Sequence, residues 1–127
     1  LTAALSAALL EKLILRPTTA RTLRRLRRQC LALIRQDATM FAKAIRATRS
    51  RDRRRFRRAL SAATAVQLQV LRHARVLQAV CRQAQRTVHP KLQSDLRCAQ
   101  AFASAAGVAA RALIQTNRAW LRQATGR

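Results

Sequence analysis

The sequence predicts an all-α fold: an antiparallel bundle of four to five long helices that forms a single domain over residues 1–127. Apolar residues recur at three- and four-residue spacing along most of the chain, which is the helical period. Two glycines and two prolines provide too few turn signals for a sheet protein. Half of the residues are apolar but only 3% are aromatic, so alanine and leucine must build the core.

The first helix is expected over residues 1–16, and Pro17 ends it because proline cannot continue a helix without losing a backbone hydrogen bond. The chain begins at Leu1 without an initiator methionine, so we expect that the domain lacks an N-terminal segment. The apolar face of this helix comprises Leu5, Ala8, Leu9 and Leu13.

A second helix is expected to start at Thr18 or Thr19, either of which can cap it, and to reach about Ala47. A short connection follows at residues 48–51. Three-and-four spacing predicts the core face of this helix as Leu23, Leu26, Cys30, Leu33, Ala38, Phe41 and Ile45.

Asp52 suits the N-cap of a third helix, because its carboxylate can accept free backbone N–H groups and interacts favourably with the helix dipole. This helix is expected to reach about Val88, and the polar and β-branched residues 64–67 can offset, kink or split it. Its predicted core residues are Phe56, Leu60, Ala63, Val66 or Leu68, Val70, Leu71, Leu77, Val80 and Cys81.

His89 and Pro90 break the pattern, and Ser94 or Asp95 is expected to cap a final helix. Residues 99–112 contain eight alanines in fourteen positions. Because small side chains let helices approach closely, we expect this helix to lie at the centre of the bundle. Its predicted core residues are Leu92, Leu96, Phe102, Ala106, Ala109, Leu113, Asn117 and Leu121.

The charge is strongly one-sided, with 27 Lys and Arg against four acids and a net charge of +23. Such a surface repels itself unless an anion neutralises it, which makes RNA or another polyanion the expected partner. Arginine offers a planar fork of donors that fits phosphate, and the affinity of such contacts falls steeply with salt. The expected RNA-binding residues form two clusters, the first of Arg24, Arg25, Arg27 and Arg28, and the second of Arg49, Arg51, Arg53, Arg54, Arg55, Arg57 and Arg58. If the middle helices are antiparallel, these clusters need not touch.

Two other interpretations of the arginines remain open: a solvated face in an arginine-rich composition, and a membrane surface. The membrane surface is the weaker of the two, because the arginines lie around the helices and the apolar faces are expected to pack in a core. Since Phe41, Phe56 and Phe102 fall on those faces, stacking of bases on aromatic rings is not expected, and recognition would be of RNA shape and backbone.

Several other classes of protein and site are excluded. No apolar run approaches the roughly 20 residues that a membrane span needs. Three cysteines are an odd number without a CxxC pair, so we expect reduced thiols in the core and a reducing intracellular location, with the mitochondrial matrix as one candidate. No spacing of histidine, cysteine and carboxylate residues predicts a metal site.

Three segments resemble the formiminotetrahydrofolate cyclodeaminase and methenyltetrahydrofolate cyclohydrolase family. Residues 31–45 (LALIRQDATMFAKAI) are similar to a family helix of leucines, an acidic-Asp-Ala-x-x-Phe run and an apolar turn. Residues 58–77 (RALSAATAVQLQVLRHARVL) resemble its Ala-Leu-x-x-Ala-x-x-Val-Pro-Leu helix. Residues 91–117 (KLQSDLRCAQAFASAAGVAARALIQTN) resemble its Asn-x-x-x-Ser-Asp segment and the alanine-rich helix that follows. Residues 1–15 are similar to the tail of the family's first helix.

The resemblance implies a cyclodeaminase-like helical fold that pairs into a homodimer and acts on a folate one-carbon group. The matching polar positions, which are the alternative catalytic residues, are Asp37, Ser94, Asp95 and Asn117. Carboxylates there could move protons at the one-carbon unit of tetrahydrofolate. The structural alternatives are a helix N-cap for Ser94 and Asp95 and a polar position at a helix interface for Asn117.

Departures from the family pattern favour a retained scaffold with a dismantled site. The family's glycine-rich stretch has no counterpart in this sequence, and Gln67 stands at the expected proline. Gln36 replaces an acidic residue, and Leu113 replaces an asparagine. We therefore expect a basic RNA-binding subunit of a large ribonucleoprotein such as a mitochondrial ribosome, surrounded by neighbouring proteins and without a cofactor. The alternatives are an active folate cyclodeaminase or cyclohydrolase that uses tetrahydrofolate, and an adaptor subunit of another complex.

Overall fold

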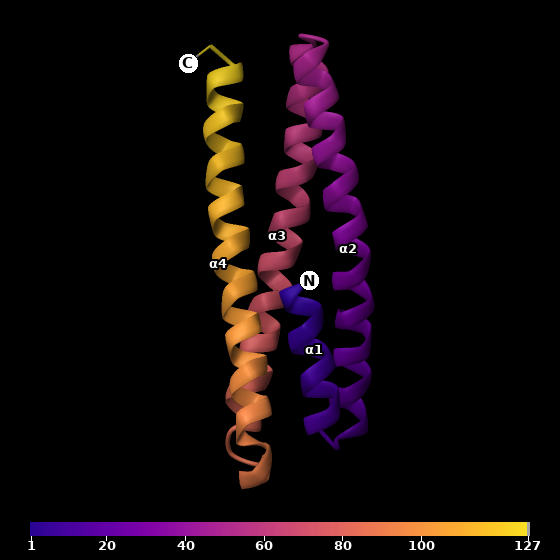
Figure 1. Cartoon of the computed structure of the whole chain (residues 1–127), viewed down its shortest axis with the longest axis vertical. Helices are drawn as coiled ribbons and strands as arrows, with labels where there is room; N and C mark the ends of the chain where they lie inside the picture. The colour runs from indigo at the N-terminus through magenta and orange to yellow at the C-terminus, as the bar shows by residue number, and fades with distance from the viewer. Residues whose placement is uncertain (127) are drawn as a thin grey trace.

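The computed structural model describes residues 1–126 (Figure 1). As the helical periodicity of the sequence predicts, it consists of four α-helices and one short 3-10 helix. The described residues contain no strand, and successive long helices run in opposite directions, so the predicted antiparallel all-α bundle is confirmed. The elements are α1 (Thr2–Leu13), α2 (Pro17–Arg49), α3 (Arg53–Ala84), the 3-10 helix η1 (Pro90–Leu92) and α4 (Gln93–Ala124).

The helix ends agree only in part with the sequence predictions. Asp52 caps α3 as expected, and its Oδ1 accepts a hydrogen bond from the backbone N–H of Arg55 at 3.0 Å. Pro17 opens α2 instead of closing α1, because its fixed φ suits the first position of a helix. The predicted caps Thr18 and Thr19 are therefore wrong, and both residues lie inside α2.

The other two long helices also differ from prediction at particular points. α3 is one continuous helix without a split at residues 64–67, where the hydroxyl of Thr64 donates to the carbonyl of Leu60 at 2.8 Å. It ends at Ala84, earlier than expected. Leu92 is the N-cap of α4 and provides no side-chain hydrogen bond, so Ser94 and Asp95 lie within its first turn and are not its cap.

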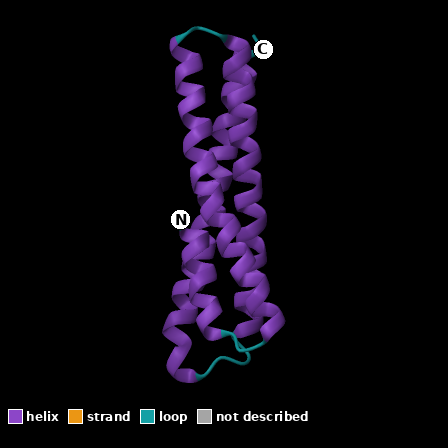
Figure 2. Cartoon of the chain, turned by 90° about the vertical axis from the view of Figure 1, so that its right-hand side faces the viewer, coloured by secondary structure: helices purple, strands orange, loops and turns teal. Residues whose placement is uncertain are grey.

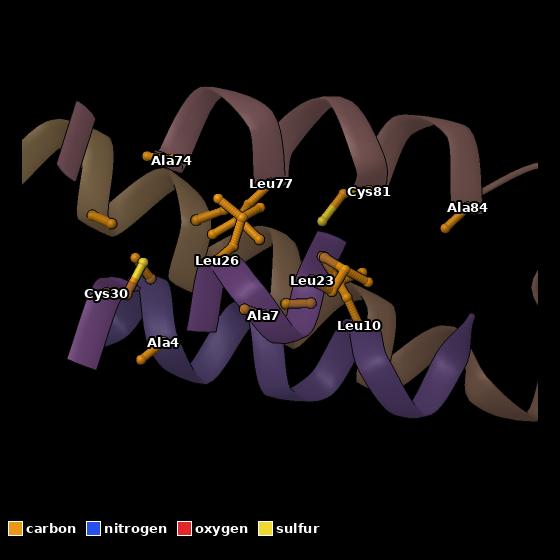
Figure 3. Packing of buried hydrophobic residues seen from close by; sticks show 14 of the residues in the cluster. Ala4, Ala7, Leu10, Leu23, Leu26, Cys30, Ala74, Leu77, Cys81 and Ala84 are labelled. Carbon is orange, nitrogen blue, oxygen red and sulfur yellow. The ribbon is translucent and has the colours of Figure 1, made fainter. Parts of the chain in front are cut away.

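The main core lies in the lower half of the bundle as drawn, where α1 packs between α2 and α4 over α3 (Figure 1). Figure 3 shows Leu10, Leu23, Leu26 and Leu77 converging there from three helices. The face of α1 that is buried comprises Ala3, Ala4, Ser6, Ala7 and Leu10, while the predicted core residue Leu5 is exposed.

Small residues on α4 allow close helix packing, as the alanine content predicted. Ala99 and Ala103 are fully buried, and the carbonyl of Ala99 accepts a hydrogen bond from the hydroxyl of Ser6 at 2.8 Å. Both α1 and α3 nevertheless pack against all three other long helices, whereas α4 packs against α1 and α3 but not closely against α2, so the prediction of α4 as the central helix is corrected.

The upper half of the bundle is more open, because α1 begins at mid-height (Figures 1 and 2). Leu1 lies beside Ile34 and Leu113 at this level. Beyond it, Phe41 is 61% exposed, and Ile45 and Leu113 are also exposed. The prediction that Phe41, Ile45 and Leu113 belong to the core is therefore wrong, because no helix among the described residues continues α1 upward to cover them.

Candidate functional site

Very few of the arginines are paired with a carboxylate in the described part of the chain. The described residues contain two ion pairs, one between Arg27 and Glu11 at 2.7 Å and one between Arg55 and Asp52 at 3.2 Å. Every other described arginine lacks a carboxylate of residues 1–126 within 4.0 Å. These side chains remain free to meet an external anion.

The first cluster lies on the early turns of α2, near the lower end of the bundle (Figure 1). Arg24, Arg25 and Arg28 point to solvent. Arg27 is half-buried and ties α2 to α1 through Glu11, whose hydrogen bond raises the pKa of the Arg27 guanidinium. Arg27 thus has an internal role that its three neighbours do not share.

The second cluster surrounds the α2–α3 connection at the upper end, the single loop at that end in Figure 2. All seven of its arginines are exposed. Arg51 makes the turn with a φ of 54°, the left-handed region that non-glycine residues seldom adopt. Arg25 and Arg49 are separated along α2 by about 36 Å at 1.5 Å per residue. The expectation that the two clusters do not touch is confirmed.

Two open hollows lie at this upper end. One has a volume of about 590 Å³ and is formed where the start of α3 faces the end of α4; its lining residues are Arg53, Arg54, Arg57, Arg58, Ser61 and Ala124. The other has a volume of about 510 Å³ and lies between α2 and α3; its lining residues are Met40, Lys43, Arg46, Ala47, Ser50, Arg55, Arg58, Ala59 and Ala62. Arg58 lines both hollows.

Reasoning from the sequence did not single out Lys43 and Arg46, although both line the second hollow. They stand three residues apart on α2, and such residues are neighbours on a helix surface. The signal in the sequence is the spacing of Lys43 and Arg46. A search for consecutive arginines does not find it, because a helix brings together cations that are separated in the sequence.

The alternative catalytic residues do not converge within the described chain. Asp37 is half-buried on α2, and its Oδ1 accepts a hydrogen bond from Nε2 of Gln67 on α3 at 2.8 Å. Asn117 is buried in the upper part of α4. Ser94 and Asp95 are exposed in the first turn of α4, and at 1.5 Å per residue Asp95 lies about 33 Å from Asn117 along the helix.

Cysteine and histidine chemistry is limited to single residues. Cys30 and Cys81 are buried free thiols as expected, and burial raises the pKa of Cys81 to about 11. Cys98 is exposed, so the expectation that all three thiols line the core is wrong for this residue. Burial lowers the pKa of His73. Residues 1–126 contain no group of three or more histidine, cysteine or acidic side chains that could hold a metal.

The formiminotransferase-cyclodeaminase family model matches residues 10–125, which include α2, α3 and α4 completely. The chain belongs to this family. The match confirms the resemblance inferred from residues 31–45, 58–77 and 91–117, and it agrees with the all-helical fold. Searches of curated proteins and of solved structures found no match to the chain. None of the family member's described helices has the length and apolarity that crossing a membrane requires.

Proposed function

We propose that this cyclodeaminase-family chain is a basic RNA-binding structural subunit of a large ribonucleoprotein, of which an organellar (mitochondrial) ribosome is an example. The observation that carries the proposal is the second cluster, seven exposed arginines around one helix connection, of which only Arg55 is paired with a carboxylate among the described residues. In this role the domain needs no cofactor, and its partners are RNA and the neighbouring proteins of the complex.

Electrostatics favours RNA over a small anionic substrate. Unpaired guanidinium groups repel one another, and bringing them together at one end of the bundle costs free energy that a bound polyanion offsets. Each arginine can donate two parallel hydrogen bonds to one phosphate. Seven exposed arginines at one end of the bundle exceed what a single small ligand can occupy.

Salt dependence of binding tests the proposal. We expect tight binding of a structured RNA hairpin, with log K falling linearly with log salt by about 0.7 to 0.9 per neutralised phosphate. A polyglutamylated folate serves as competitor and should displace none of the RNA. Binding that is weak or insensitive to salt would contradict the proposal and favour an adaptor role without nucleic acid.

A folate cyclodeaminase or cyclohydrolase activity is the second candidate, favoured by the family match and by the polar pair Asp37–Gln67. This pair lines a cavity of about 220 Å³ together with Leu1, Cys30 and Leu113. Saturable binding of a one-carbon tetrahydrofolate that Asp37→Asn abolishes would support this candidate, with Asp95→Asn as a control distant from the cavity. Loss with both variants would instead place the site between two copies of the chain.

A further inference from the structure

The two hollows at the upper end lie on neighbouring faces of the first turns of α3, one toward α4 and the other toward α2. The first is lined by four arginines, and none of its lining residues is acidic. The second contains Lys43 and Arg46 from α2 together with Arg55 and Arg58 from α3. Because Arg58 lines both, the hollows adjoin over this one side chain.

We propose that one RNA strand crosses α3 at this point, with successive phosphates in the two hollows and Arg58 between them. The inference rests on the proposed RNA-binding function and identifies which end of the bundle performs it. A guanidinium presents five donors, so Arg58 can donate to two phosphate groups at once. A lysine at this position would have to serve both phosphates from a single point charge.

The lining of each hollow suits a phosphate in a different way. Ala47 and Ala59 are buried and form an apolar floor for the second hollow, beneath exposed cations from α2 and α3. Asp52 pairs with Arg55 at 3.2 Å and withdraws part of that cation's charge from the second hollow. The first hollow has no such counter-charge in its lining, so it should hold the more tightly bound phosphate.

The two arginine clusters differ in a way that the inference explains. In the first cluster Arg27 is occupied by Glu11, and the other members lie along a single helix. In the second, cations from α2 and α3 surround common hollows. A strand can therefore be held from two sides at the upper end, whereas α2 alone presents one row of charges at the lower end.

The test compares single variants that remove the same charge at the two ends. Arg58→Gln should lower the salt slope for an RNA hairpin by about 0.7 to 0.9, the change for one lost cation, and should weaken binding at fixed salt more than a variant in either hollow alone, because both phosphates lose one of their contacts. Arg53→Gln in the first hollow and Lys43→Gln in the second should each lower the slope by about 0.7 to 0.9. Arg25→Gln, at the far end of α2, is the matched control and should change it least. Circular dichroism of each variant checks that the helices are retained, and the expected spectra are unchanged because all four side chains are exposed.

Equal slopes for Arg58→Gln and Arg25→Gln, with the unmodified chain still binding RNA, would overturn this inference and leave the proposed function standing. If Arg25→Gln lowered the salt slope more than Arg58→Gln, this inference would be wrong, and the RNA strand would bind at the lower end of the bundle. Failure of the unmodified chain to bind RNA in a salt-dependent way would remove the proposed function and this inference with it.

Discussion

Replacing Leu77 by alanine should cost far more stability than replacing Phe41, although Phe41 is the larger apolar residue. Leu77 is 0% exposed and lies among Leu10, Leu23 and Leu26 (Figure 3). A Leu→Ala change in such a core costs about 2 to 5 kcal/mol, because the lost transfer free energy is joined by the cost of the cavity. Phe41 is 61% exposed, so only about two-fifths of its surface is in contact with the rest of the protein and contributes to stability.

The expected cost at Phe41 follows from its area. A phenylalanine that buries about 200 Å² when fully enclosed buries about 80 Å² here, which is worth about 2 kcal/mol at ~25 cal/mol per Å² as an upper bound. In Phe41→Ala the alanine keeps part of that contact and has a higher helix propensity, so we expect the free energy of unfolding to fall by about 1 kcal/mol. For 127 residues this is roughly 4 °C in melting temperature.

Urea denaturation followed by circular dichroism at 222 nm compares the two variants under identical conditions. Phe41→Ala should shift the midpoint slightly, and Leu77→Ala should shift it by at least twice as much, with unchanged slopes. A loss at Phe41 equal to that at Leu77 would refute the reasoning. It would mean that another segment covers the upper half of the bundle in solution.

Three further predictions concern single residues. Asp52→Ala should lower the stability of the chain by about 1 kcal/mol in a thermal melt, because the first turn of α3 loses its side-chain acceptor; an unchanged melt would contradict this. Iodoacetamide should modify Cys98 in the folded chain, while the buried Cys30 and Cys81 should react only after unfolding; mass spectrometry that finds all three modified at equal rates would refute it. Burial lowers the pKa of His73, so neutral His73 contributes stability above the unfolded pKa of about 6.5 that is lost as the pH falls toward the folded pKa. His73→Gln should therefore reduce the loss of stability between about pH 7 and 5, and an unaltered pH profile would exclude this contribution.

The fold class and most helices could be predicted from the sequence, because three-and-four spacing reports directly on which residues share a helix face. Asp52 could also be assigned, since a capping carboxylate acts locally on the following turn. Phe41 and Leu5 could not, because periodicity shows that a face is apolar but not whether another helix reaches it. Coverage of a face depends on the length of its neighbour, and α1 has 12 residues against the 33 of α2, so it extends along little more than a third of that helix (Figure 1).

The sequence predicts that positive charge is concentrated in the candidate site, but it does not predict how the charged side chains are arranged in space. The seven arginines of residues 49–58 are conspicuous in the sequence, and their location at one end follows from a helical hairpin. The sharing of Arg58 between two hollows depends on how α4 and α2 flank α3, which local sequence does not encode. Lys43 joins the site for the same reason, because it is brought to Arg58 by packing between helices.

Family membership and a strongly basic surface are compatible because they depend on different residues. The bundle is specified by its interior, where Ala99, Ala103 and Leu77 permit no change in volume without cost. Arginines such as Arg111 and Arg118 stand at exposed positions of α4, which tolerate substitution as long as the helix forms. A scaffold can therefore retain its family packing while its surface changes, and the fold alone does not establish the chemistry.

The high positive charge also affects the stability of the fold. Repulsion between the cations lowers the stability of the free chain, and a polyanion that binds the folded state raises it by RT ln(1 + [L]/Kd). On this argument a bound polyanion should raise the stability of the folded domain, and the second arginine cluster, where unpaired charge is densest, is the part of the fold that would gain most from it.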